Sequence, residues 1–166
     1  MSTIRVRCLL QQCTKATLRL QDDSQVTIAR GMVAFVAFLK DAQLEDVNKL
    51  GREEYNAKIR NYGHFCLAKE LATVKLCESD EGLKTIVEIG GDLLIIPQAT
   101  LGGRLNAHRF QYHHNINKDI GLEFYEKFLL NLRELCSANL VQSGTYGIRQ
   151  IYSCETNGPA MHLIEF

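Results

Sequence analysis

The sequence predicts an α/β domain in which a mixed β-sheet forms barrel-like layers with helices on one side. Its 166 residues fit one domain, 1–166, and 46% hydrophobic with 23% charged residues is enough to bury a core. Segments in which apolar and polar residues alternate predict strands near both ends of the chain, and two segments with a helical apolar period lie between them. Interleaved strands and helices favour a mixed sheet covered on one side.

The N-terminal part is predicted to be mostly strand. Residues 4–20 alternate on both sides of a polar corner at 11–15, which is the pattern of a β-hairpin. A short strand at 26–28 leads through Gly31 into MVAFVAFLK (32–40), an apolar run typical of a central strand buried on both faces.

Two helical segments divide the rest of the chain. Residues 43–71 carry the first helical period, and 122–136 predict an amphipathic helix of about four turns. The segment 102–121 has neither period and predicts a long loop, which in compact domains is often functional. The remaining strand patterns lie at 73–77, 85–89, 93–96, 140–142, 150–154 and 161–166.

Composition narrows the function classes. No stretch reaches the roughly 18 apolar residues of a membrane span and the start is not a signal sequence, so we expect a cytoplasmic protein without a membrane partner. Nineteen Lys and Arg balance nineteen Asp and Glu, which excludes a global basic field but allows contact with one end of a nucleic acid. Six cysteines without a C-x-x-C pair favour buried, reduced thiols.

The predicted long loop is the most basic part of this neutral chain. Phe110 and Tyr112 are interleaved with its cations, a pattern that suits stacking on an unpaired base or, equally, a solvated loop with two aromatic residues tucked beneath it. Its histidines lack the spacing and the acidic neighbours of a metal site, so no metal is expected; they are His108, His113 and His114.

The usual catalytic motifs are missing. There is no G-x-S-x-G elbow, no cysteine in a pattern that lowers its pKa, and no phosphate-loop or dinucleotide fingerprint, so no cofactor is expected. The only prolines, Pro97 and Pro159, both stand in turn-like motifs. Pro97 must end or edge a strand because it cannot donate to the ladder.

Each proline motif has two interpretations. After Pro97, the backbone N–H groups of Gln98, Ala99 and Thr100 form either an amide nest for a carbonyl or oxyanion, or a plain strand-ending bend. The turn at Asn157, Gly158 and Pro159 is either a rigid wall that discriminates a small substituent or an ordinary turn.

The two motifs together carry a resemblance. PQATL (97–101) and TNGPAMH (156–162), with LLQQC, QYHHN and GTYGIRQ elsewhere, resemble the D-aminoacyl-tRNA deacylases, and more narrowly the animal-type branch that removes L-alanine wrongly attached to threonine tRNA. The resemblance covers almost the whole chain except 41–71.

The resemblance implies a homodimer in which the two motifs of opposite subunits meet at the active site. The implied reaction is hydrolysis of the ester that joins an amino acid to the terminal adenosine of tRNA, with no metal or cofactor. Gln98, Ala99 and Thr100 become the catalytic floor, and the residues implied in substrate binding are Pro97, Asn157, Gly158, Pro159, Gln12 and Arg149. Such an ester is already reactive, so positioning and an amide nest suffice and the missing nucleophile is explained.

Two departures bear on specificity. The common deacylases have Gln-Arg where this chain has Gln11 and Gln12, so the arginine that braces the Gly–Pro turn is missing and Arg149 is the candidate replacement. A turn held differently enlarges the pocket and weakens rejection of L-amino acids. Ala160 and Met161 also stand where a bulkier residue and a threonine are expected.

Two other classes remain open. A catalytically idle homologue would bind tRNA ends or other nucleic acid through the basic loop at 104–118. An interaction module would use the segment 41–71 as its contact surface.

Overall fold

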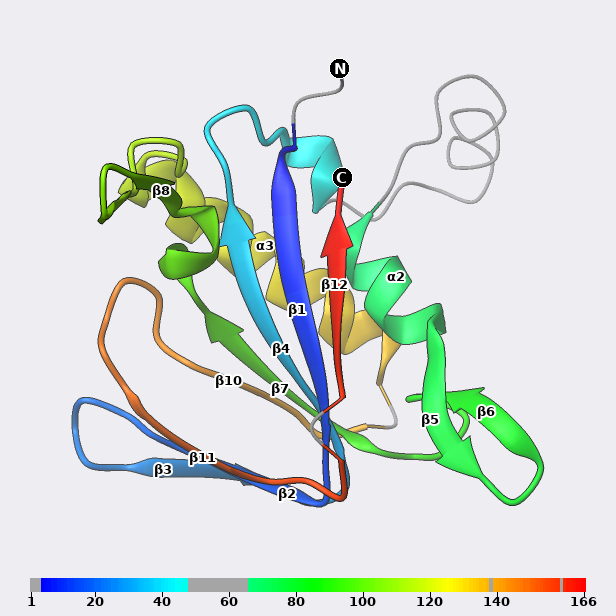
Figure 1. Ribbon diagram of the computed structural model, residues 1–166. Coiled ribbons are helices and arrows are strands. Elements are labelled where there is room, and N and C mark those ends of the chain that lie inside the picture. Colours follow the sequence, from blue (N-terminus) through cyan, green and yellow to red (C-terminus); the bar gives the residue numbers. More distant parts are fainter. Residues whose placement is uncertain (1–3, 48–65, 138, 159) are drawn as a thin grey trace, which may run out of the picture.

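The computed structural model describes residues 4–47, 66–137, 139–158 and 160–166, and its centre is a five-stranded sheet (Figure 1). The strand order is β10-β7-β4-β1-β12. β4 is parallel to β7 and β7 to β10, whereas β1 is antiparallel to both β4 and β12, so the sheet is mixed as predicted. The bounds are β1 (Val6–Cys13), β4 (Gly31–Phe38), β7 (Asp92–Pro97), β10 (Val141–Ser143) and β12 (Met161–Glu165).

The α-helices α2 (Leu67–Thr73) and α3 (Lys118–Leu135) cover one face of this sheet (Figure 1). The helix predicted at 122–136 is confirmed and begins one turn earlier, where the Asn117 side chain accepts a hydrogen bond of 2.9 Å from the backbone N–H of Asp119. Phe128 and Leu132 of α3 are fully buried in the core between the helices and the sheet.

A second sheet packs on the opposite face. It has the order β11-β2-β3, with bounds Ile151–Glu155, Lys15–Arg19 and Gln25–Ile28. Its buried side chains form a separate apolar cluster with the main sheet, composed of Cys13, Ala16, Leu18, Ile28, Val33, Leu94 and Ile96. The two sheets form stacked layers, as the prediction of barrel-like layers implies, but they do not close into a barrel.

The prediction of a β-hairpin for residues 4–20 is wrong, because the two strands do not pair with each other. β1 and β2 lie in different sheets, because the polar corner at 11–15 is a bend from one sheet into the other. The chain reverses later, where the N–H of Leu20 donates to the carbonyl of Ser24 at 2.9 Å. β3 and β4 then return along β2 and β1, and Gly31 permits the return bend because a Cβ there would overlap the carbonyl oxygen of Asp92.

The central part of the chain differs from the expectation in three places. Within the segment 43–71 the structure describes a short 3-10 helix, η1 (Leu44–Asp46), and α2, and residues 48–65 lie outside the described part. β5 (Lys75–Ser79) pairs with β6 (Gly82–Thr85). The strand predicted at 85–89 is a turn, because the backbone N–H and hydroxyl of Thr85 bond the carboxylate and N–H of Glu88.

The segment 102–121 contains local structure in place of a long loop. After η2 (Ala99–Gly102), β8 (Arg104–Asn106) pairs with β9 (Arg109–Gln111) in a small hairpin. Ala107 and His108 both have positive φ angles, of 43° and 68°, which is the conformation of a two-residue hairpin turn.

The described residues contain no helix long and apolar enough to cross a membrane and no group of three or more His, Cys, Asp or Glu side chains arranged for a metal ion. All six cysteines are unpaired, and five of them are buried. Burial raises the pKa of Cys136 to about 11, so this thiol is protonated at neutral pH.

Candidate functional site

The candidate site begins where β7 ends at Pro97. The next residue is tied back to the neighbouring strand, because the N–H of Gln98 donates to the carbonyl of Val36 at 2.8 Å. The chain then turns into η2, in which Leu101 N–H donates to the Gln98 carbonyl at 3.1 Å. In this first turn the N–H groups of Ala99 and Thr100 have no acceptor among the described residues, as expected at the start of a helical turn.

The carbonyl groups of this turn are anchored by side chains. Asn115 donates to the carbonyl of Ala99 at 2.9 Å, and it fits only because Gly102 has no side chain to overlap it. Arg7 donates to the carbonyl of Leu101 at 2.7 Å while its guanidinium pairs with Glu165 at 2.7 Å. The turn is thus held from the sheet and from the segment before α3, which fixes the direction of its free amides.

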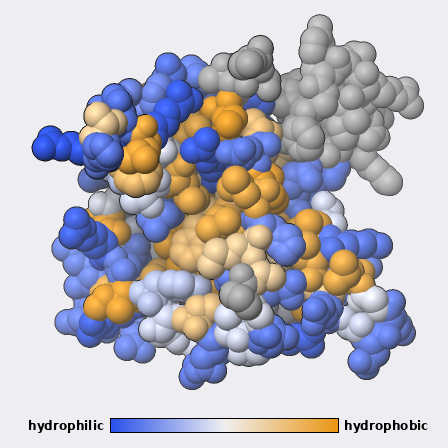
Figure 2. All heavy atoms as spheres, viewed as in Figure 1, coloured by the Kyte–Doolittle hydropathy of each residue, from blue (hydrophilic) through white to orange (hydrophobic). Residues whose placement is uncertain are grey.

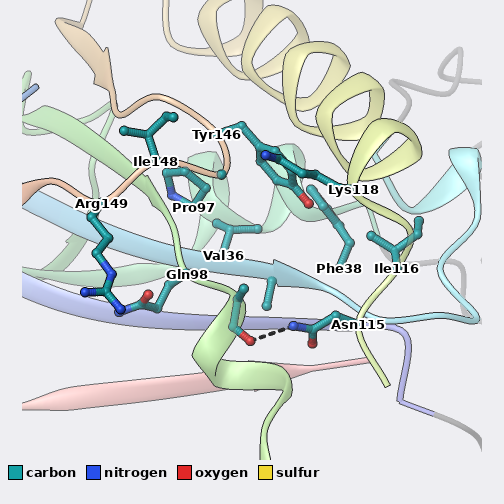
Figure 3. A pocket seen from close by; sticks show the side chains of 13 residues that line it. Val36, Phe38, Pro97, Gln98, Asn115, Ile116, Lys118, Tyr146, Ile148 and Arg149 are labelled. Carbon is teal, nitrogen blue, oxygen red and sulfur yellow. Dashed lines mark hydrogen bonds between the residues drawn. The ribbon is translucent and has the colours of Figure 1, made fainter. Parts of the chain in front are cut away.

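A cavity of about 400 Å³ opens beside this turn (Figure 3). Pro97, Gln98 and Ala99 line one side of it, the end of β4 lines another, and the start of α3 and the loop 144–149 complete it. A volume of this size suits a small-molecule group such as one nucleoside.

The loop 144–149 is held rigidly over the cavity. The N–H of Gly144 donates to the carbonyl of Ile95 at 2.8 Å, and the Tyr125 hydroxyl lies 3.1 Å from the carbonyl oxygens of both residues. The Gln150 side chain accepts from Thr145 N–H at 2.8 Å and donates back to the Thr145 carbonyl at 3.0 Å. Burial raises the pKa of Tyr125, so its hydroxyl stays a donor at neutral pH.

The cavity is positively charged. Lys118 and Arg149 line it and no carboxylate does. Figure 3 shows Arg149 and Gln98 toward one end and Lys118 with Tyr146 toward the other. Burial raises the pKa of Tyr146, which keeps this phenol neutral. The arrangement suits an electron-rich or anionic ligand, and it offers amide donors without a nucleophile or a general base.

The structure brings part of the predicted site together. Pro97, Gln98, Ala99 and Arg149 share the cavity, and Thr100 is exposed at the next position. One expectation needs correction: the backbone N–H of Gln98 is consumed by the Val36 carbonyl, so two free amides remain instead of three.

The other predicted residues lie elsewhere in the same chain. Gln12 and Asn157 line a separate small pocket, and the Gln12 side chain donates to the carbonyl of Leu76. Pro159 lies outside the described residues. Gly158 precedes β12, three strand spacings or about 14 Å across the sheet from β7.

The turn at Gly158 is held by a residue that differs from the one expected. The buried Gln11 side chain lies 3.3 Å from the hydroxyl of Thr156 and 3.3 Å from the carbonyl of Gly158. Within one chain, Arg149 lines the cavity and makes no hydrogen bond to this turn among the described residues. Gln11 therefore occupies the bracing role for which Arg149 was the candidate.

Three cavity residues were missed as site residues by the motif search. Asn115 follows QYHH, Lys118 begins α3, and Tyr146 lies within GTYGIRQ. Both sequence segments were noted for their resemblance, but nothing in their composition shows that they meet in space.

Comparisons with known proteins agree with the geometry. The family model described as D-Tyr-tRNA(Tyr) deacylase matches residues 9–165. A Danio rerio protein named D-aminoacyl-tRNA deacylase 2 is 35% identical over 98% of this chain and 100% of its own length. The Homo sapiens protein of that name is 37% identical over 98% of this chain and 95% of its own. A solved structure described as a probable eukaryotic D-amino acid tRNA deacylase has a TM-score of 0.76 at 25% identity, covering 97% of this chain and 99% of its own.

The role of Tyr125 in holding the loop 144–149 is directly testable. We expect Tyr125→Phe to lower the free energy of unfolding by about 1–3 kcal/mol, because the single O–H that lies between the Ile95 and Gly144 carbonyl groups is lost; Ile95 keeps the Gly144 N–H as a donor, whereas the Gly144 carbonyl loses its bond to Tyr125. Amide hydrogen exchange at Gly144 and Thr145 should also accelerate. Tyr112→Phe is the control, since it removes an exposed hydroxyl and should change the stability by less than about 0.5 kcal/mol. Equal stabilities in urea unfolding would contradict the assignment.

Proposed function

The chain belongs to the D-Tyr-tRNA(Tyr) deacylase family, and from that premise we propose that residues 1–166 form one editing domain that hydrolyses the ester of mischarged aminoacyl-tRNA. The observation that carries the proposal is a nucleoside-sized, positively charged cavity beside two free amides at Ala99 and Thr100. The proposed substrate is an intermediate of translation, so we expect the protein to act in the cytoplasm.

The chemistry follows from the groups present. A water molecule attacks the ester carbonyl carbon, and the N–H groups of Ala99 and Thr100 stabilise the negative oxygen that develops. The bond to the ribose oxygen then breaks, that oxygen takes up a proton, and a free amino acid and a tRNA with a free 3′ hydroxyl are released. The neighbouring ribose hydroxyl orients the water, so the enzyme contributes mainly positioning.

The charged residues have a distinct task. Lys118 and Arg149 line the cavity without a carboxylate partner there, which suits the phosphate of the terminal nucleotide. Gln98 and Asn115 add side-chain amides that can bond the polar groups of ribose or adenine. No cofactor is needed for these steps.

The substrate is proposed to be D-aminoacyl-tRNA, L-alanyl-tRNA(Thr) or both. Gln11 holds the Gly158 turn with a short neutral side chain in place of the arginine expected next to it in the common deacylases. A turn held in this way leaves more space beside the α-carbon of the substrate for its amino-acid side chain. The similarity to the animal proteins named D-aminoacyl-tRNA deacylase 2 supports the same branch.

We further propose that the active form is a homodimer. The second sheet leaves part of the main sheet's face away from α2 and α3 uncovered, and there an apolar patch lies over β1, β4 and β12 (Figure 2). Met161 and Leu163 of the edge strand β12 are 58% and 55% exposed, which is unusual for large apolar side chains on a sheet. A partner that covers this face can bring its own Gly158 turn to the cavity, which Gly158 does not reach within one chain.

Substitution of Ala99 by proline tests the amide site. Ala99 is the first residue of η2, and Gln98 before it is not helical (φ −136°, ψ 82°), so a proline at position 99 is at the helix position that tolerates it while one N–H is lost. We expect kcat for D-aminoacyl-tRNA hydrolysis to fall about 10²- to 10³-fold. Ala99→Val adds similar bulk but keeps the N–H, and Thr100→Val removes only a hydroxyl; both should stay within about tenfold of wild type. Equal losses in Ala99→Pro and Ala99→Val would refute the role of the amide.

Single-turnover assays test the breadth of the substrate filter. We expect wild-type protein to hydrolyse L-alanyl-tRNA(Thr) as well as D-aminoacyl and glycyl tRNAs. Gln12→Arg restores the arginine of the common deacylases and should lower the L-alanyl rate relative to the D-aminoacyl rate by about tenfold or more. No detectable L-alanyl hydrolysis by the wild type at physiological enzyme concentration would exclude this specificity.

Mixing two inactive variants tests the composite site. A Cβ at Gly158 meets nothing within 4 Å, so Gly158→Leu fits within its own chain but would obstruct a partner's cavity. After equal mixing and subunit exchange with Ala99→Pro, half of the dimers carry one site with both motifs intact, and about a quarter of wild-type activity should return. A mixture that stays inactive while native mass spectrometry shows heterodimers would mean that the motifs act within one chain.

A further inference from the structure

The β8–β9 hairpin projects from the molecule next to η2 and the end of β4 (Figure 1). Every residue from 104 to 113 is exposed. Leu105 pairs with Phe110 across the hairpin, and their side chains are 65% and 61% exposed; Tyr112 is 45% exposed. The aromatic side chains are therefore displayed to solvent and are not tucked beneath a loop.

The hairpin is also the centre of a basic surface. No aspartate or glutamate occurs between Asp92 and Asp119, whereas the interval holds three cations and three histidines. Arg104 pairs with Gln111 and Arg109 with Asn106 in the hairpin register, so both guanidinium groups lie on the polar side of the ribbon. Desolvation and the nearby Arg104, His113 and Lys40 lower the pKa of His114, as expected where cations crowd together.

This surface is continuous with the candidate cavity. A Cβ at Gly103 would come within 2.8 Å of the Tyr112 ring and 3.2 Å of the Phe110 ring, so both aromatic residues pack beside the end of η2. Asn115, three residues after Tyr112, lines the cavity and bonds the Ala99 carbonyl. An extended ligand that leaves the cavity at this side would pass directly onto the hairpin.

We propose that the hairpin binds the unpaired RNA segment that precedes the nucleotide in the cavity, with Phe110 and Tyr112 stacking on bases and Arg104 and Arg109 contacting phosphates. The inference rests on the proposed function, because it needs a terminal nucleotide in the cavity. Each three-residue strand is about 10 Å long, enough for about three stacked nucleotides. Exposed aromatic rings on one side of a hairpin and cations on its other side, in a stretch without an acidic residue, match a single-stranded polyanion.

A second copy of this chain is a poorer match for the same surface. The chain has a net charge of zero, and an apolar patch, not a charged one, lies over β1, β4 and β12 (Figure 2). The hairpin has three exposed apolar side chains on one side and cations on the other. An RNA strand can contact both, because its bases stack on the apolar side and its phosphates bind the cations.

The test compares two substrates that share the scissile ester. One is a full aminoacyl-tRNA, and the other is the 3′-aminoacyl-adenosine of the same amino acid, which has no preceding nucleotides. We expect Phe110→Ala to lower kcat/KM on the tRNA about five- to hundredfold and to leave hydrolysis of the aminoacyl-adenosine unchanged. Equal losses on both substrates, or no loss on the tRNA, would overturn the inference.

A binding measurement gives an independent readout. The probe is an RNA minihelix with a four-nucleotide unpaired 3′ end, and its affinity is measured across salt concentrations. Arg104→Ala/Arg109→Ala should reduce the slope of log affinity against log salt by about 1.4, or 0.7 for each lost phosphate contact. The matched control, Lys75→Ala/Lys127→Ala, removes two exposed cations from β5 and α3 and should leave the slope unchanged.

The remaining outcomes are separable. If the wild type hydrolyses neither ester but the hairpin variants still lose RNA affinity and salt slope, the proposed function fails and the RNA surface stands. If the hairpin variants shift the solution mass from dimer to monomer, the hairpin is a subunit contact and the inference fails.

Discussion

The hydrogen bond from the Gln98 N–H to the Val36 carbonyl determines where the main sheet stops and the cavity begins. It is the last bond between β7 and β4, and it holds the residue after Pro97 in line with the sheet. The chain can turn only beyond it, so the first amides without partners are those of Ala99 and Thr100. The same bond that withdraws one amide from the site therefore fixes the positions of the next two.

Helix α3 connects the other walls of the cavity to the end of β7. Tyr125 on its buried face reaches the carbonyl groups of both β7 and the start of the loop 144–149, so the strand end and the loop share one anchor. Asn115 links the segment before α3 to the turn at Ala99. The Tyr125 bonds are buried and the Asn115 bond is exposed, and together they connect the walls of the cavity to its floor, which gives a preorganised site.

The sequence predicted what depends on local pattern and missed what depends on pairing. The buried central strand at 32–40, the helix at 122–136 and the strand end at Pro97 follow from apolar period and proline chemistry, and all three are confirmed. The hairpin at 4–20 failed because an alternating pattern does not reveal which strand is its partner. The β8–β9 hairpin was missed because its turn uses Ala107 and His108 at positive φ in place of the usual Asn and Gly.

The candidate site shows the same division. The PQATL motif predicted the floor of the candidate site. Only the fold shows that the Gln98 N–H bonds the Val36 carbonyl. The fold also shows that cavity residues come from distant segments, namely Asn115, Lys118 and Tyr146. Gln11 and not Gln12 bonds the Gly158 carbonyl, because side chains of adjacent strand residues point to opposite faces and that of Gln12 bonds the Leu76 carbonyl instead. Sequence motifs therefore led to the proposed chemistry, and strand register determines which neighbouring side chain makes each contact.

The separation of the two proline motifs within one chain has a physical consequence for specificity. A filter for the substituent at the α-carbon must be rigid, since a mobile wall would accept both hands of an amino acid, and it must stand opposite the amides that hold the ester. Gln11 and Thr156 make the Gly158 turn rigid, but the width of the sheet keeps it from its own cavity. The exposed apolar side chains of β12 lie immediately after that turn, so burying them against a second subunit would deliver a preformed filter to a preformed floor. Association would then supply the selectivity that a single chain with this topology cannot build.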